Sequence, residues 1–201
     1  MGGPGSEPSG PEHGRSGGTG EAPGDAAETD AVDELRGQWE RERPDLAGLG
    51  AMALVGRINR ASHLLSKGMR QVFAQFGLEQ QEFDVLATLR RAGAPHELTP
   101  GGLLKSAMVT SGAITNRLDK LERKGLVERR PDPDDRRMVR VRLTPEGLEL
   151  VDRVVVLHVA NEERMLAALD EEDRRALDRA LRRLLVSLGD THLGSAGGRR
   201  R

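Results

Sequence analysis

The sequence predicts a mainly α-helical fold that contains one small β-hairpin, and three observations support this prediction. Apolar residues recur every three to four positions over most of residues 30–193, which is the spacing of one face of a helix. Near residue 126 the period changes to two, which is the spacing of a strand. The chain of 201 residues has no Tyr, one Trp and three Phe, so aliphatic side chains must fill the core.

The two ends of the chain differ in composition from the centre. Residues 1–29 contain nine Gly and four Pro, carry a net charge of −4, and have almost no large apolar side chains. Such a segment cannot bury enough surface to offset the entropy of ordering. We therefore expect a disordered acidic tail over 1–29, a second disordered tail over 194–201, and a folded domain over 30–193.

Composition and motifs exclude several classes of protein. With no Cys, the chain can form no disulfide, no thiolate metal site and no cysteine nucleophile. No run of about 18 apolar residues could span a membrane, and the N-terminus lacks a signal-peptide pattern. The five His residues lack metal-ligand spacing, and neither a nucleophile elbow nor a phosphate-binding glycine loop occurs. We expect a cytoplasmic protein without enzymatic activity, cofactor or metal.

The N-terminal half of the domain predicts three helices in succession. An additional N-terminal helix is expected over residues 30–43, before the helix-breaking Pro44. A long helix over 45–76 follows, and Gly77 ends it. A third helix is expected over 79–91. The apolar face of the first helix consists of Val32, Leu35 and Trp39.

The next stretch has the outline of a helix-turn-helix. Pro100 favours the first position of a short helix. A second helix begins at Thr110 or Ser111 and continues to Lys124, and Gly125 stops it. The apolar face of this second helix consists of Ile114, Leu118 and Leu121.

A basic hairpin and two more helices complete the domain. Residues 126–143 alternate apolar and charged side chains around the turn-rich segment PDPDDRR, which predicts two strands with a charged tip. A helix begins after Thr144, and Asp170 caps a final one. Both lie within residues 145–189.

The distribution of charge favours DNA as a partner. Residues 99–143 carry eleven basic and six acidic side chains, a net charge of +5, whereas the whole chain carries −1. A helix-turn-helix followed by a basic hairpin can place a helix in the major groove and the hairpin tip in the minor groove. The alternative for each polar residue on this helix is a solvated face. The expected DNA-contacting residues are Thr110, Ser111, Thr115, Asn116 and Lys120 on the helix, and Arg136 and Arg137 on the hairpin.

Residues 108–150 resemble the winged helix-turn-helix of the MarR family of transcriptional regulators, and the wider similarity covers roughly residues 49–189. The motifs that carry it are Asp132-Pro133-x-Asp135-Arg136-Arg137 at the hairpin tip, or wing, and Leu143-Thr144-Pro145-x-Gly147 after it.

The resemblance implies a MarR-like homodimer. Helices over 45–76 and 145–189 would form the dimer scaffold, and residues 79–143 would form the DNA-binding lobe. Two lobes would bind half-sites of a pseudopalindromic operator about 10 bp apart. Arg136 or Arg137 would enter the minor groove, and Asp135 would hold the wing instead of contacting DNA.

Two charged residues lie where apolar ones are expected. Arg117 borders the apolar face of the second helix, and Asp84 interrupts an apolar run in the third predicted helix. A buried guanidinium group requires a carboxylate or another anion nearby. We therefore predict that Asp84 pairs with Arg117 or Arg129, either as a structural ion pair or as part of an anion site.

This set of residues resembles the urate-responsive UrtR group of MarR regulators, which carry a Trp on an additional N-terminal helix. The resemblance implies that the ligand-binding residues are Trp39, Asp84, Arg117 and Arg129. A planar purine anion would stack near Trp39, an Arg would take its charge, and repulsion of Asp84 would displace the recognition helix. Trp39 could instead anchor the core.

We therefore expect a transcriptional repressor that a small anion, urate or a similar metabolite, releases from DNA. Other anions that fit an arginine-lined site are citrate, aconitate and aromatic acids. An alternative of another class is a protein-interaction module without ligand sensing, in which the hairpin binds an acidic partner.

Overall fold

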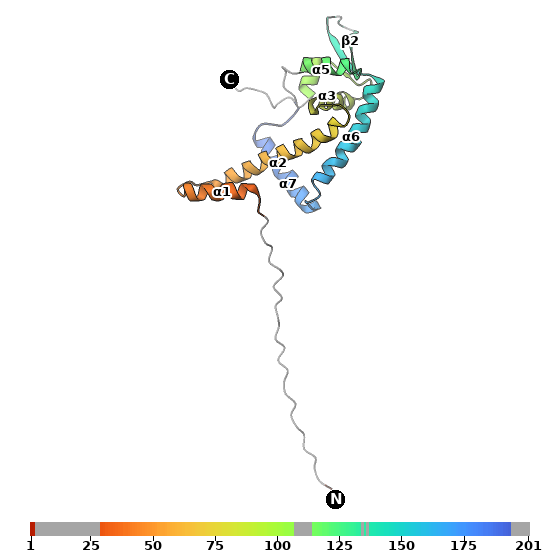
Figure 1. Ribbon diagram of the computed structural model, residues 1–201. Helices are drawn as coiled ribbons and strands as arrows, with labels where there is room; N and C mark the ends of the chain where they lie inside the picture. Colours follow the sequence, from red (N-terminus) through yellow and green to blue (C-terminus); the bar gives the residue numbers. More distant parts are fainter. Residues whose placement is uncertain (3–28, 107–113, 134, 136, 194–201) are drawn as a thin grey trace. The chain divides into compact units, whose positions relative to one another are not determined.

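The computed structural model describes residues 1–2, 29–106, 114–133, 135 and 137–193, and it confirms a mainly helical fold with a small sheet (Figure 1). Its helices are α1 Ala31–Glu42, α2 Leu49–Ala74, α3 Gln80–Arg91, α4 Pro100–Ser106, α5 Ile114–Arg123, α6 Pro145–Met165 and α7 Glu171–Ser187. Its strands are β1 Glu97–Leu98, β2 Val127–Pro131 and β3 Val139–Leu143. Across the described residues, no helix is long and apolar enough to cross a membrane.

The chain forms two compact units, Met1–Gly56 and Arg57–Arg201. The first unit contains α1 and the start of α2, and the second contains the remaining elements. The expected tails, residues 1–29 and 194–201, fall almost entirely outside the described residues.

Helix α1 begins with a reciprocal cap. The Asp30 carboxylate accepts hydrogen bonds from the backbone N–H groups of Val32 and Asp33 at 2.8 and 3.0 Å, and the Asp33 carboxylate accepts one from the Asp30 N–H at 3.1 Å. Val32 is buried, whereas Trp39 is 44% exposed. The prediction that Trp39 could anchor the core is therefore wrong for the single chain. Helix α2 starts at Leu49, later than expected, because residues 44 and 45 form a turn and residues 46–48 are not helical.

The sheet has one strand more than the hairpin that the sequence predicts. Its order is β1-β3-β2, and both pairings are antiparallel. The hairpin register runs from Val127 opposite Leu143 to Pro131 opposite Val139. With only two residues, β1 is too short to show an alternating pattern, which is why the sequence does not reveal it.

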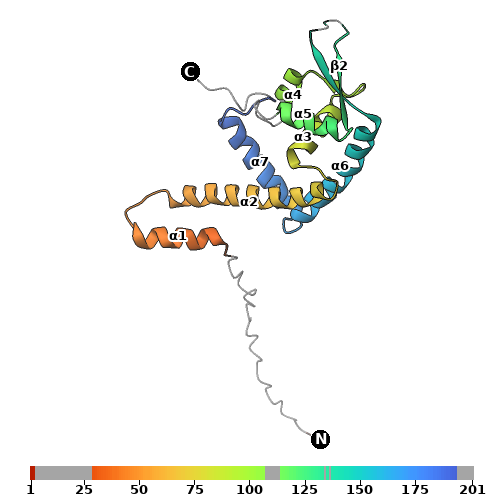
Figure 2. The ribbon, with the colours of Figure 1, turned by 45° about the horizontal axis from the view of Figure 1, so that its top comes forward.

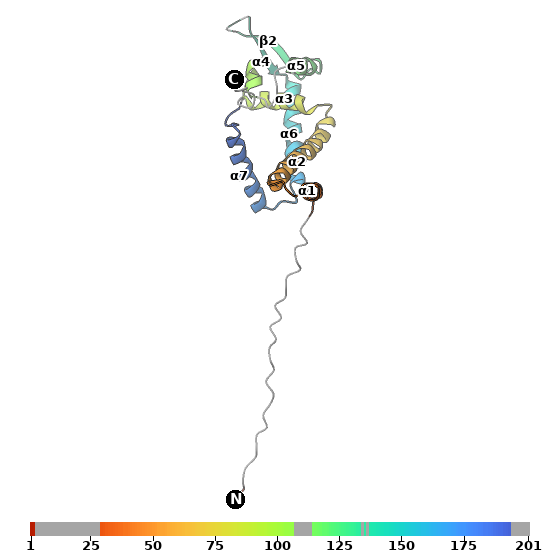
Figure 3. The same ribbon diagram turned by 90° about the vertical axis from the view of Figure 1, so that its left-hand side faces the viewer.

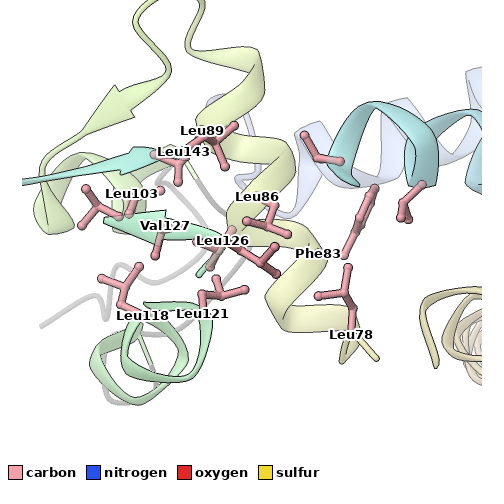
Figure 4. Packing of buried hydrophobic residues seen from close by; sticks show 14 of the residues in the cluster. Leu78, Phe83, Leu86, Leu89, Leu103, Leu118, Leu121, Leu126, Val127 and Leu143 are labelled. Carbon is pink, nitrogen blue, oxygen red and sulfur yellow. The ribbon is translucent and has the colours of Figure 1, made fainter. Parts of the chain in front are cut away.

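The core of the second unit is built around α3, which lies between the α4–α5 pair and the C-terminal end of α2 (Figures 2 and 3). The predicted apolar face of α5 is confirmed, because Ile114, Leu118 and Leu121 are all buried. Leu118 and Leu121 point from α5 toward Leu126 and Val127 (Figure 4).

A glycine contact fixes the start of α6 on the helix-turn-helix. A Cβ atom at Gly147 would lie 2.0 Å from the Leu126 carbonyl oxygen, so no larger residue fits there. The Thr144 hydroxyl donates to the Gly125 carbonyl oxygen at 2.7 Å and accepts from the Gly147 N–H at 3.0 Å. The Leu-Thr-Pro-x-Gly motif therefore connects the wing, α5 and α6 physically.

Candidate nucleic-acid interface and anion site

The exposed face of α5 carries some of the polar residues that the sequence assigns to DNA contact. Thr115 and Asn116 are exposed, on the side away from the buried stripe. Thr110 and Ser111 lie outside the described residues, and so does the expected start of this helix. The described part of α5 therefore presents Thr115 and Asn116 to solvent, where base edges could be reached.

Lys120, expected to contact a phosphate, is engaged within the protein. Its Nζ donates to the Glu79 Oε1 at 2.7 Å, and both side chains are more than one-third exposed. The hydrogen bond from Lys120 lowers the pKa of Glu79, with help from the positive charges of Lys120, Lys124 and Arg117. An exposed pair of this kind contributes about 0.2–1 kcal/mol, so a phosphate can compete with Glu79 for Lys120.

The wing is held by a buried carboxylate, Asp132, which belongs to the wing motif but to which the sequence analysis gave no role. Asp132 is 6% exposed, and its carboxylate accepts from the Arg140 Nε at 2.6 Å and from the Asp135 N–H at 3.2 Å. The Asp135 carboxylate accepts from the Arg137 N–H at 2.9 Å. The Arg140 guanidinium also reaches Glu97 in β1, at 3.4 Å. The motif thus orders the wing through two aspartates.

The two wing arginines predicted to contact DNA are only partly described. The Arg137 side chain is exposed, and Arg136 lies outside the described residues. The Asp135 carboxylate holds the backbone N–H of Arg137, and the Arg137 side chain lies in solvent.

The predicted pairing of Asp84 is wrong. Within the described part of the chain, Asp84 forms no ion pair with Arg117 or Arg129. Arg129 instead donates to Asp119 and Glu122 of α5, each at 2.5 Å. The reason is topological: β2 follows the turn at Gly125 and returns alongside the last turns of α5. The bond to Asp119 raises the pKa of Arg129.

Arg117 is left with an unsatisfied group. Its Nη1 atom is buried and has no hydrogen-bond partner among the described residues. Burial raises the pKa of Asp84, and the positive charges of Arg117, Arg91 and His158 oppose that shift. Arg117 and Asp84 therefore influence each other electrostatically without a closed hydrogen-bonded pair.

A cleft of about 260 Å³ opens beside Asp84, between α3 and α6. Its lining includes the apolar side chains of Phe83 and Val155 together with Arg91 and His158. The His158 ring packs 5.2 Å from the rings of both Phe73 and Phe83, measured between centroids, and its Nε2 lies 3.2 Å from Glu162. Of the four predicted ligand residues, Asp84 alone lines this cleft.

Trp39 belongs to the first unit, whereas the other three predicted ligand residues belong to the second. Its exposed ring is available for stacking. The grouping of Trp39 with Asp84, Arg117 and Arg129 rests on the resemblance alone.

Comparisons with known proteins agree on one family. The model of the MarR family matches residues 78–139. The HTH-type transcriptional regulator PecS of Dickeya dadantii is 40% identical over 153 residues, which cover 76% of this chain and 92% of PecS.

Solved structures show the same fold. The MarR family regulator AbsC of Streptomyces coelicolor matches with a TM-score of 0.62 and 25% identity, covering 71% of this chain and 96% of AbsC. BpsR of Bordetella bronchiseptica, whose DNA binding is regulated by 6-hydroxynicotinic acid, matches with a TM-score of 0.58 and 25% identity, covering 64% of this chain and 90% of BpsR.

Proposed function

Because the chain belongs to the MarR family of transcriptional regulators, we propose that it is a homodimeric repressor released from its operator by a small anion. The family assignment makes it a DNA-binding regulator and not an enzyme. The observation that carries the ligand part of the proposal is the buried Arg117 Nη1, which lacks a partner among the described residues.

An anion near Arg117 would supply the hydrogen-bond acceptor that its Nη1 lacks among the described residues. A buried donor without an acceptor costs about 1–3 kcal/mol, and more when the group is charged. The same anion would repel the Asp84 carboxylate, which is already disfavoured by burial. Movement of the Arg117 end of α5 away from α3 would relieve that repulsion, and a ligand shifts the equilibrium only through such a difference between two states.

We propose urate or a similar planar anion as the ligand. The resemblance to the UrtR group supports this choice through Trp39, Asp84, Arg117 and Arg129. The regulation of BpsR by 6-hydroxynicotinic acid, a heterocyclic acid, supports the same chemical class. Arg129 would join the site only after the ligand displaces Asp119 or Glu122. Citrate, aconitate and aromatic acids are the competing ligands.

Exposed Thr115 and Asn116 on α5 and exposed Arg137 on the wing support the proposed DNA contacts. Two lobes, one from each protomer, would bind half-sites of a pseudopalindromic double-stranded operator. The residues proposed to contact DNA are Thr110, Ser111, Thr115, Asn116, Lys120, Arg136 and Arg137.

Exposed apolar side chains support the proposed dimer. Helix α7 buries none of its residues in the single chain, although it carries several leucines. Such a helix gains stability only when another surface covers its apolar stripe. The dimer scaffold would use residues 45–76 and 145–189. The exposed apolar residues on α6 and α7 include Val155, Val156, Leu157, Val159, Leu177, Leu184, Leu185 and Val186.

Titration of a protein–DNA complex tests this function. The DNA would be the region upstream of the protein's own gene, and the readout would be fluorescence anisotropy with added urate or citrate. We expect urate to release the wild-type chain, and Arg117→Gln to keep DNA binding but lose the response at least tenfold. Arg123→Gln, which removes an exposed charge from the same helix, is the control and should still respond.

Two results would contradict the proposal. One is that urate releases Arg117→Gln and Asp84→Asn from DNA at the same concentration as the wild type, which would contradict the proposed anion site. DNA affinity that does not fall steeply with rising salt would favour the protein-interaction alternative, because phosphate contacts make DNA binding salt-dependent.

A further inference from the structure

A lysine at the C-terminal end of α5 reaches a fully buried carboxylate in α3. Glu82 is 0% exposed, and the Lys124 Nζ donates to its two oxygens at 2.8 and 2.7 Å. The same Nζ donates to the Gly77 carbonyl oxygen at 2.8 Å. An ammonium group has three hydrogens, so all three donors of Lys124 are used inside the protein.

The carboxylate of Glu82 is equally occupied. Besides the two bonds from Lys124, its Oε2 accepts from the backbone N–H of Glu79 at 2.7 Å, at the start of α3. A buried carboxylate is tolerated only when such donors surround it. Removal of Lys124 would leave this charge without its cation.

The two residues connect three elements. Gly77 and Glu79 form the corner between α2 and α3, and next to Glu82 the Phe83 ring stacks on Phe73 of α2 with centroids 4.4 Å apart. Lys124 follows the last residue of α5. One side chain therefore ties the end of α5 to the corner between α2 and α3.

We propose that Lys124 and Glu82 are positioning residues for DNA binding. They hold α5 at a fixed orientation on α3, so that its exposed residues enter the groove together. The inference rests on the proposed use of α5 as the recognition helix. In this arrangement Lys124 contacts no phosphate, although its charge and its place at the end of α5 suggest such a contact. Its three donors are bound to Glu82 and Gly77 instead.

A second lysine–glutamate pair one turn earlier provides a matched control. Lys120 and Glu79 join the same two helices at the same 2.7 Å separation, but the Glu79 side chain is 57% exposed. Loss of Glu79 leaves no buried charge behind. Glu79→Gln should therefore bind DNA at least as tightly as the wild type, since it frees Lys120.

The experiment measures affinity for the upstream DNA at several salt concentrations, with the full chain and with Lys124→Met, Glu82→Gln and the double variant. We expect each single variant to bind at least tenfold more weakly, with the slope of log K against log salt unchanged. The double variant should bind no more weakly than the weaker single variant, because both changes break one unit.

Three results would overturn the inference. If Lys124 contacts a phosphate, Lys124→Met lowers the salt slope by about 1, while Glu82→Gln binds normally. If the pair only stabilises the fold, the variants unfold at lower temperature but bind DNA normally well below that temperature. If the wild-type chain shows no salt-dependent DNA binding, the proposed function itself fails, and this inference fails with it.

A folding defect would not hide the answer. If a single variant does not fold, Glu82→Met combined with Lys124→Met replaces both charges by apolar groups, so that no charge stays buried without a partner. This variant should fold, as seen by circular dichroism, and still bind DNA at least tenfold more weakly. Wild-type affinity in the folded double variant would contradict the inference.

Discussion

Two charged couples at the boundary between α5 and α3 differ in how completely their hydrogen bonds are made. At the end of α5, Lys124 and Glu82 satisfy each other, with further bonds to the backbone of the α2–α3 corner. Near its start, Arg117 and Asp84 influence each other without an ion pair, and the Arg117 Nη1 has no partner among the described residues. The closed couple is Lys124–Glu82, and the open couple is Arg117–Asp84.

The difference suggests that the two ends of α5 have different roles. A closed couple resists displacement, because movement would expose or orphan a buried charge. An open couple has an unfilled hydrogen-bonding capacity that an added anion can use. A ligand would therefore act on α5 near Arg117, while Lys124 holds the other end on the α2–α3 corner.

The largest expected effect comes from breaking the closed couple. Lys124→Met should lower the free energy of unfolding by about 3 kcal/mol, because Glu82 is then buried without its cation. Urea denaturation of both proteins measures this difference. Lys120→Met is the control and should lose less than 1 kcal/mol, since its partner Glu79 is exposed. Equal losses in the two variants would show that the Lys124–Glu82 pair stabilises the fold no more than the Lys120–Glu79 pair does.

Breaking the open couple should cause little or no loss of stability. Arg117→Met removes a guanidinium whose Nη1 is already unsatisfied, so the free energy of unfolding should stay within about 1 kcal/mol of the wild type or rise. The same urea experiment measures it. A loss comparable to that of Lys124→Met would mean that Arg117 has a strong partner in the folded protein.

The pH dependence of stability sharpens the contrast. Burial raises the pKa of Asp84 above its ordinary value of 3.8, so the ionised carboxylate is disfavoured in the folded state. Below pH 3.8 Asp84 is neutral and its burial costs no ionised charge. This contribution to the free energy of unfolding is lost as the pH rises through the folded-state pKa of Asp84. Asp84→Asn should be more stable than the wild type at pH 7, and the advantage should shrink as the pH falls toward 3.8.

Thermal unfolding of the wild type and of Asp84→Asn would measure this difference in stability. The pH would run from about 3.5 to about 7, the range in which carboxyl groups titrate. Glu149→Gln, which removes an exposed carboxylate from α6, is the control for the loss of one acidic side chain. A constant difference between Asp84→Asn and the wild type across this range would exclude titration of Asp84 as the cause.

Much of this arrangement could be predicted from local sequence patterns. The buried stripe of α5 follows from helical periodicity, and Gly77 and Gly125 end their helices with positive φ angles of 63° and 70°. The misplaced charges Asp84 and Arg117 were also visible. Periodicity and turn chemistry depend on neighbours in the chain, so they can be read without knowing the fold.

The pairing of charges could not be predicted, because it depends on how elements meet. Arg129 reaches Asp119 and Glu122 only because β2 returns along α5. Glu82 did carry a signal, since it lies four residues before Leu86 and seven before Leu89, on the buried face of α3. A glutamate on that face indicates a buried carboxylate, but it does not identify Lys124 as its partner.

The smallest expected effect concerns the exposed pair beside the closed couple. Glu79→Gln should change the free energy of unfolding by about 0.5 kcal/mol or less, because solvent already screens the Lys120–Glu79 interaction. The change should also disappear at 1 M salt, where the screening length falls to about 3 Å. Urea denaturation at low and high salt measures both quantities. A loss that exceeds 1 kcal/mol and persists in high salt would show that Glu79 belongs to the closed couple, so that Lys120 and Lys124 hold the helix as one unit.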